Sequence, residues 1–373
     1  MPFCHAPWSN IDISPQGNIM PCCKYQPQAA TPNINSHSIV EYFSSAELAT
    51  VKQQFLADQW PSGCDRCRIE EENNIASKRE LDYQRWSKHY DAYNLDSNQL
   101  LTASVAFGNT CNLKCTVCGP EASSRWQQEY QDIMGINVLP NHFYKAGVVE
   151  ELLEYAPNII HLDIPGGEPL LSGVPQQQNL LQAYVNSGQA RDISIHYTTN
   201  ATIWPDNTWW DLWSHFKEID MQLSLDGVGT RFEYLRFPAN WEEVTKNVKQ
   251  YQAKSLLLPN LRLSISHTVS AYNIYYLDEF FAWCEQQHLP EPWCGRVHIP
   301  NHARPAVWPH AVRNEIATHL LSSVRPQVRN WAGLMTNTDD SEYFEEFQRR
   351  VCLHDAYRKL SFTTTFPELA KFI

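Results

Sequence analysis

The chain has 373 residues, a net charge of −12 at pH 7 and 11 cysteines. This length exceeds one small domain and fits a large domain with an accessory unit. The acidic balance argues against a nucleic-acid surface, because phosphate binding needs a local basic excess. The odd number of cysteines, grouped in motifs, argues against a disulfide framework and for metal binding in a reducing compartment. No segment is apolar over enough residues to cross a membrane, and the first residues lack the charged start and apolar core of a signal peptide, so we expect a cytoplasmic protein.

The N-terminal segment combines four cysteines with a predicted hairpin. Cys4, Gly17 and Cys22 follow the pattern C-x12-G-x4-C, and Cys64 and Cys67 add a C-x2-C pair. A hairpin is predicted over residues 10–20 around Pro15-Gln-Gly17, and a helix over 45–58. Four thiolates would ligate one closed metal cluster, with Cys23 as an alternative to Cys22, whereas a structural zinc ribbon would use the same residue types.

A second cysteine group follows a charged helical segment at residues 68–93 and a short buried strand at 103–107. Cys111, Cys115 and Cys118 have the spacing C-x3-C-x2-C. An iron-sulfur cube has four irons, so a loop with three thiolates leaves one iron free to bind a small molecule. The alternative is an incomplete structural zinc site. The preceding strand places the loop at a strand's C-terminal end, where α/β barrels build their active sites.

Strands and helices alternate beyond this loop. Further strands are predicted at 159–164, 192–198, 218–225, 261–269 and 293–297, with helices between them at 176–186, 241–253 and 274–287. Such alternation predicts a parallel sheet with its functional loops along one edge. Short helices are predicted at 314–323 and 342–350, after which the tail either closes the barrel or contacts substrate.

Polar motifs follow several of these strands. The segment from Asp163 to Pro169 contains Gly166, Gly167 and Glu168, where two glycines allow close backbone approach and a carboxylate can accept from an ammonium group. Ser224 begins Ser-Leu-Asp-Gly, and Arg236 follows twelve residues later; a hydroxyl and a guanidinium are suitable donors to a carboxylate. Arg236 could instead pair with Glu233 or Asp226. Further polar groups that could line a pocket are His196, Tyr197, His267, Thr268, Arg296 and His298.

Together these motifs resemble the radical S-adenosylmethionine (SAM) enzymes, and the N-terminal cysteines resemble the part of the SPASM motif retained in Twitch domains. The resemblance implies an α/β fold with a partial (β/α)6 barrel at residues 101–305. It also implies a Twitch-like domain at 1–70, a helical connection at 71–100 and a helical C-terminal extension at 306–373. In most relatives the auxiliary domain follows the barrel, whereas here it precedes it. Val117 stands where the family usually has an aromatic residue near the adenine.

The same resemblance implies cofactors and residue roles. Cys111, Cys115 and Cys118 would hold a 4Fe-4S cluster whose open iron binds SAM, and Cys4, Cys22, Cys64 and Cys67 would hold an auxiliary 4Fe-4S cluster. Gly166, Gly167 and Glu168 would hold the SAM amino group, Ser224 and Arg236 its carboxylate, and Asn200 would reach the ribose.

The expected activity is reductive cleavage of SAM to a 5'-deoxyadenosyl radical that abstracts hydrogen from a substrate. The electron would come from a flavodoxin or ferredoxin, and the auxiliary cluster would take or relay an electron, since full ligation leaves it no open iron. The substrate would be a peptide or protein side chain, or a small molecule such as an amino sugar. Two alternatives are a non-catalytic two-cluster electron-transfer protein and a zinc-stabilised interaction protein.

Overall fold

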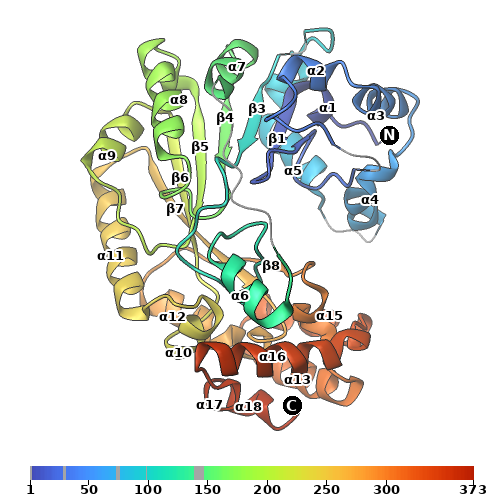
Figure 1. Cartoon of the computed structure of the whole chain (residues 1–373), viewed down its shortest axis with the longest axis vertical. Coiled ribbons are helices and arrows are strands. Elements are labelled where there is room, and N and C mark those ends of the chain that lie inside the picture. Colours follow the sequence, from blue (N-terminus) through green and yellow to red (C-terminus); the bar gives the residue numbers. More distant parts are fainter. Residues whose placement is uncertain (1, 28–30, 73–75, 98, 138–146) are drawn as a thin grey trace. The chain divides into compact units, whose positions relative to one another are not determined.

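The computed structural model describes residues 2–27, 31–72, 76–97, 99–137 and 147–373. The chain divides into two compact units. The first unit comprises Met1–Thr110, Asn141–Tyr197 and Pro205–Asp220, and the second comprises Cys111–Pro140, Thr198–Trp204 and Met221–Ile373. Both units contain strands and helices, as the alternating pattern predicted (Figure 1).

The strands confirm the α/β prediction. In the described residues they are β1 (Asn10–Ile13), β2 (Ile19–Met20), β3 (Thr102–Val105), β4 (His161–Ile164), β5 (Ser194–Thr199), β6 (Glu218–Ser224), β7 (Leu261–Val269) and β8 (Trp293–Arg296). They form an eight-stranded sheet in the order β2-β1-β3-β4-β5-β6-β7-β8. Each of the six strands predicted from residue 103 onward is present, and β7 has the predicted bounds. Active-site loops of such a sheet follow the C-terminal ends of its strands.

The helices lie before, between and after these strands. The first unit contains α1 (Ala6–Ser9), α2 (Ile39–Phe43), α3 (Ala46–Leu56), α4 (Asp65–Glu72), α5 (Lys78–Asp91), α7 (Val148–Tyr155), α8 (Val174–Asn186) and α9 (Asn207–Ser214). The second contains α6 (Trp126–Met134), α10 (Thr230–Leu235), α11 (Trp241–Leu257), α12 (Leu277–Gln286), α13 (His310–Leu321), α14 (Pro326–Arg329), α15 (Ala332–Asn337), α16 (Phe344–Arg358), α17 (Phe362–Thr365) and α18 (Pro367–Ala370).

The N-terminal hairpin extends the sheet of the first unit. β1 and β2 pair antiparallel, as predicted, and Gly17 takes the positive φ of 85° that the turn requires. β1 also pairs in parallel with β3, with Asn10 opposite Thr102 and Ile13 opposite Val105. Ile11 and Ile13 are almost fully buried, so this strand is part of the main core. The predicted auxiliary-cluster segment therefore shares its sheet with the strand that precedes the second cysteine group.

Alternation along each strand decides which polar residues can face the inside of the sheet. Tyr197 was predicted as a pocket residue together with its neighbour His196, but successive residues of a strand face opposite sides. The Tyr197 ring is fully buried against Trp209 and Trp213 of α9. The prediction was therefore wrong for Tyr197.

His267 requires the same correction in the second unit. β7 and β8 pair in parallel there, with His267 opposite Cys294. The His267 ring packs on Phe280 of α12 with ring centroids 4.2 Å apart, and its Nδ1 lies 2.9 Å from the Leu225 carbonyl oxygen. His267 is thus a packed core histidine, and its burial lowers its pKa to about 4.

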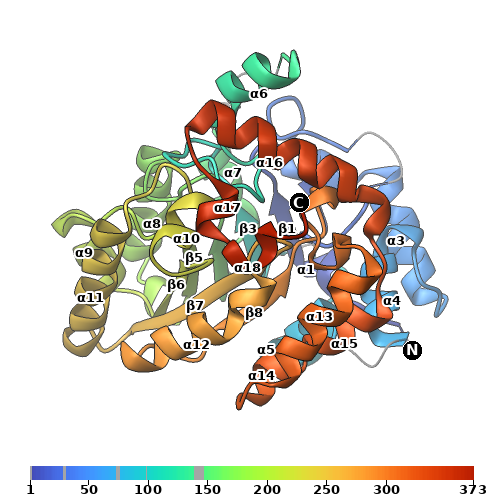
Figure 2. The same ribbon diagram turned by 90° about the horizontal axis from the view of Figure 1, so that it is seen from below.

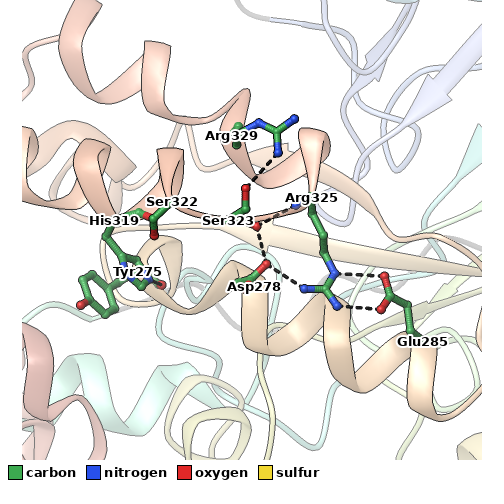
Figure 3. A network of polar contacts seen from close by, with 8 residues as sticks. All are labelled: Tyr275, Asp278, Glu285, His319, Ser322, Ser323, Arg325 and Arg329. Atoms are coloured by element: carbon green, nitrogen blue, oxygen red, sulfur yellow. Dashed lines mark hydrogen bonds and ion pairs between the residues drawn. The ribbon is translucent and has the colours of Figure 1, made fainter.

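The predicted C-terminal helices are present in the second unit, where α13, α16, α17 and α18 follow β8 (Figure 2). An ion-pair network joins the segment after α13 to α12 (Figure 3). Arg325 contacts Asp278 at 2.9 Å and Glu285 at 2.7 Å, while Ser323 donates to Asp278 at 2.5 Å. This network attaches the segment that follows α13 to α12.

Candidate metal centres

Four of the predicted ligands line one cavity in the first unit. Its walls include Cys4, Cys22, Cys64 and Cys67. Cys22 lines the cavity and Cys23, which is exposed, does not. Cys22, and not Cys23, therefore lies beside the same cavity as the other three predicted ligands.

Local structure explains why these cysteines meet. Cys64 precedes α4 and Cys67 lies in its first turn, so the three-residue offset puts both side chains on one side of the helix. Cys22 follows β2 after one residue, and Cys4 precedes α1, where Phe3 stacks on Trp8 at 5.2 Å. Trp8 belongs to a small apolar cluster with Tyr25, Val51 and Phe55, against which Cys4, Cys22 and Cys64 pack. The cavity is therefore enclosed by apolar packing.

Cations also line this cavity. Lys24, Lys78 and Arg79 are among its walls. Arg79 pairs with Glu71 at 2.6 Å and donates to the Phe3 carbonyl oxygen at 3.0 Å, next to Cys4. Burial raises the pKa of the Cys4 thiol to about 12. Such thiols ionise readily only beside a metal or cations, so the donor set fits an iron-sulfur cluster with four thiolate ligands.

The cysteines of the second predicted group, Cys111, Cys115 and Cys118, belong to the second unit. They lie on the loop that follows β3 in the chain. Burial raises the pKa of the Cys118 thiol to about 12, and the neighbouring Cys111 thiol raises it further. Burial also raises the pKa of the Cys115 thiol, with Arg236 lowering it and Cys111 and Cys118 raising it. The charge of each neighbouring thiolate therefore adds to the effect of burial on these pKa values.

Two backbone contacts hold this loop to the segment that contains Arg236. The Lys114 N–H donates to the Phe237 carbonyl at 2.7 Å, and the Thr116 N–H donates to the Leu235 carbonyl at 2.8 Å. Arg236 lies between these two acceptors in the chain. Its guanidinium pairs with Asp226 at 2.8 Å, and both residues are buried. Of the two carboxylates considered as its partner, Asp226 is therefore the one it contacts; Glu233 accepts from the Trp241 N–H instead.

Asn200 also contacts the cysteine loop. Its Nδ2 donates to Asn112 Oδ1 at 2.9 Å and lies 3.9 Å from the Cys111 sulfur. Asn112 in turn donates to Thr202 Oγ1 at 2.8 Å. The residue predicted to reach the ribose thus orients the first part of the loop.

The glycine motif lies in the first unit, next to the residues that lead into the cysteine loop. The Glu168 N–H donates to the Thr110 carbonyl at 2.9 Å, one residue before Cys111. A Cβ on Gly166 would approach the Gly108 carbonyl oxygen to 2.9 Å, and a Cβ on Gly167 would clash with the Thr110 carbonyl oxygen. Both glycines have positive φ, so this close contact explains the pair. The Glu168 carboxylate is fully buried and accepts from the Leu170 N–H at 3.2 Å.

Ser224, the remaining predicted SAM contact, ends β6 and is buried. It belongs to the second unit, as do the three cysteines and Arg236.

The structure also reveals a row of polar residues across the sheet. His196 in this row was predicted as a pocket residue, whereas Asp12 and Ser104 were missed from the sequence. Asp12 lies opposite Ser104, Ser104 opposite Asp163, and Asp163 opposite His196, on four adjacent strands of the first unit. His196 Nδ1 lies 2.9 Å from Asp220 Oδ2. The available signal was the alternation of polar and apolar residues along these strands, which is ordinary in a half-buried sheet.

Helix α5 covers this face of the sheet, because Trp86 packs on His161 with ring centroids 5.2 Å apart. Burial raises the pKa of Asp12 to about 6, with a hydrogen bond from Ser104 and the charge of Lys78 opposing the shift and Asp163 adding to it. Burial likewise raises the pKa of Asp163. The row therefore binds protons more tightly than isolated aspartates do.

Two further observations concern the described ranges as a whole. No three His, Cys, Asp or Glu side chains there converge as a single metal ion requires. A four-iron cluster takes each thiolate on a different iron, so its ligands need not converge on one point. No helix in these ranges has the length and apolar character needed to cross a bilayer.

In the comparison with known proteins, one family model matches part of the chain. Residues 4–68 match SPASM, an iron-sulfur cluster-binding domain. No curated protein matches the chain.

Similar solved structures include native anSMEcpe with bound AdoMet and Kp18Cys peptide, at a TM-score of 0.44 and 16% identity over 59% of this chain and 57% of that one. They also include Streptococcus suis SuiB bound to S-adenosylmethionine, at a TM-score of 0.36 and 13% identity over 96% of this chain and 72% of that one. A third is TYW1 with a lysine-pyruvate adduct bound, at a TM-score of 0.35 and 14% identity over 60% of this chain and 74% of that one. The chain spans about half the length of native anSMEcpe, 52% of that chain. TM-scores this low carry no argument about function. All four cysteines that line the cavity lie within the residues matched by the SPASM iron-sulfur domain.

Proposed function

We propose that this chain is a radical SAM enzyme with an N-terminal auxiliary iron-sulfur domain. The proposal keeps the predicted organisation: an auxiliary domain at 1–70, a connection at 71–100, a barrel at 101–305 and an extension at 306–373. The observation that carries it is the loop with Cys111, Cys115 and Cys118, which follows the parallel strand β3 in the chain and holds one buried and two half-buried thiols. Three thiolates leave one position of a 4Fe-4S cluster open.

Two residues of the same unit as the three thiols, Ser224 and Arg236, suit the carboxylate end of an amino acid. Arg236 lies near the Cys115 thiol and is held by Asp226, and its Nε has no hydrogen-bond partner among the described residues. We assign Arg236 and Ser224 to the SAM carboxylate, Gly166, Gly167 and Glu168 to its amino group, and Asn200 to its ribose. When bound, the open cluster and SAM supply a 5'-deoxyadenosyl radical. The protein residues orient SAM, bury its charges and exclude water.

The four-cysteine cavity supports an auxiliary cluster. Its cations Lys24, Lys78 and Arg79 are each paired with a carboxylate, and one of those carboxylates, Asp82, also lines the cavity. The support for a cluster is therefore the set of four thiols and not a surplus of positive charge. Because all four irons would be ligated by protein, we assign this site to electron transfer, with substrate bound elsewhere. A flavodoxin or ferredoxin is the proposed electron donor, and the substrate class is a peptide or protein side chain or a small molecule such as an amino sugar.

Anaerobic reconstitution tests the proposal. We expect about eight irons per chain and formation of 5'-deoxyadenosine from SAM and dithionite. The triple variant C111A/C115A/C118A should lose about four irons and all 5'-deoxyadenosine. The double variant C294A/C352A is the matched control, because neither cysteine lines the cavity or lies on the loop; it should keep both properties.

Other outcomes identify the alternatives. Zinc without iron would indicate a zinc-stabilised interaction protein. Full iron loading with no SAM-dependent product would indicate an electron-transfer protein with two clusters. Product formation that is unchanged in the triple variant would contradict the proposal directly.

A further inference from the structure

A fully buried carboxylate connects the cysteine loop to the C-terminal extension. Glu129 lies on α6 and has no exposed surface. Its Oε2 lies 2.6 Å from the Lys114 ammonium, and Lys114 stands between Cys111 and Cys115. Its Oε1 lies 2.8 Å from Arg358 Nε and 2.8 Å from His354 Nδ1, both on α16. One carboxylate thus joins the loop, α6 and α16, all within the second unit.

Aromatic rings enclose these charges. The Lys114 ammonium lies 4.9 Å from the centre of the Tyr357 ring and 5.4 Å from that of Phe237. The Arg358 guanidinium lies 4.6 Å from the centre of the Trp126 ring and also faces Phe237. Charges in such surroundings are costly unless they stay paired, so each partner fixes the position of the others.

The loop depends on such contacts because residues 111–118 form neither helix nor strand. The main chain of Lys114 is held by the Phe237 carbonyl, and its side chain by Glu129. Lys114 directly precedes Cys115, so a shift of its backbone would displace that thiol. α6 and α16 lie side by side in both views of the chain (Figures 1 and 2) and contact each other.

We propose that Glu129 and Arg358 are positioning residues, through which α16 fixes Lys114 and thereby the arrangement of Cys111, Cys115 and Cys118. The cluster-holding role of these cysteines rests on the proposed function, whereas the restraint on the loop does not. Helix α16 of the C-terminal extension accordingly restrains the cysteine loop through Glu129.

Hydrogen exchange tests the restraint in the protein before any cluster is built. Glu129→Gln removes the charge and keeps nearly the same shape. Amide exchange at residues 111–118 should rise by about tenfold or more, while exchange in β7 stays the same. Lys114→Met is the second variant, because Glu129 keeps its ion pairs with Arg358 and His354 in that protein. This variant should loosen the loop even if Glu129→Gln folds poorly.

The matched control is Arg325→Gln, which removes the ion pairs of Figure 3 between the C-terminal extension and α12. It should leave exchange in the cysteine loop unchanged. Equal loop exchange in Lys114→Met and the wild type, or an equal rise in Arg325→Gln, would overturn the proposal.

Spectroscopy of the reconstituted protein adds a readout that general destabilisation does not produce. In Lys114→Met the electron paramagnetic resonance spectrum of the three-cysteine cluster should shift, and the spectrum of the auxiliary cluster should not. A wild-type protein that cleaves no SAM would contradict the proposed function, while the exchange result would still decide the role of Glu129. An unaltered spectrum in Lys114→Met would overturn the effect on the cluster.

Discussion

Asp12 shows how one residue of the polar row affects stability. Its pKa of about 6 lies above the ordinary aspartate value of 3.8, so folding favours its protonated form. Because the pKa is higher in the folded state, the contribution of Asp12 to the free energy of unfolding is full below about pH 4 and is lost as the pH rises through 6. Lys78, Ser104 and Asp163 are the groups that face it, and only Asp163 reinforces the shift.

We therefore expect Asp12→Asn to stabilise the folded protein at pH 7, by up to about 3 kcal/mol, and to change little at pH 4. Urea unfolding across this pH range measures the difference. Asp211→Asn, at an exposed position, is the control and should show no such pH-dependent gain. A loss of stability at pH 7 in Asp12→Asn would contradict the expectation.

At the scale of single elements, the start of α5 is important because this helix carries Lys78 and Arg79 into the walls of the four-cysteine cavity. Ser77 caps the helix by accepting from the Glu80 N–H at 3.2 Å, and it also donates to Glu71 at 2.6 Å. Ser77 is fully buried.

Ser77→Ala should therefore cost about 1–2 kcal/mol of stability and speed the release of iron from the auxiliary site to a chelator. Ser38→Ala is the matched control, because Ser38 caps α2 by accepting from the Glu41 N–H in a similar capping box, and no residue of α2 lines the cavity. It should cost about 1 kcal/mol and leave iron release unchanged. Thermal unfolding and chelator kinetics measure both effects, and equal iron release in the two variants would contradict the role of α5.

The elements also show what local sequence can predict. Apolar runs between helical segments located β3 to β8, because burial of a parallel strand leaves a local pattern. The pairing of β1 with β3 was not predictable, since it joins Asn10 to Thr102 across a long segment and no local pattern encodes that contact. The two cysteine groups were predictable from spacing, whereas Glu129 was not, because its partners Lys114 and Arg358 meet it only through tertiary packing.

At the scale of the whole molecule, the two cysteine groups belong to different compact units. The four residues that line the cavity are in the first unit, and the three on the loop are in the second. Each group takes its described supporting contacts from its own unit, as with Arg79 for Cys4 and Arg236 for Cys115. We therefore expect each site to bind its iron independently of the other site.

The double variant C64A/C67A should consequently lose about four irons and keep the four at the other site, with reductive cleavage of SAM retained. Iron analysis and 5'-deoxyadenosine measurement on the same sample check both parts. The single variant C23A is the control, because that thiol lies outside the cavity lining, and it should retain all the iron. Loss of every iron from C64A/C67A would show that the two sites depend on each other.

The place of β1 in the sheet has a consequence for proteins exposed to oxygen. Cys4 precedes β1 by six residues and Cys22 follows β2 by two, so the proposed auxiliary cluster would fasten both ends of the hairpin. Destruction of that cluster would remove this fastening, while β1 would still be held by its pairing with β3 and by the burial of Ile11 and Ile13. Oxidative loss of the metal should thus loosen the two ends of the hairpin first, and the sheet itself only afterwards.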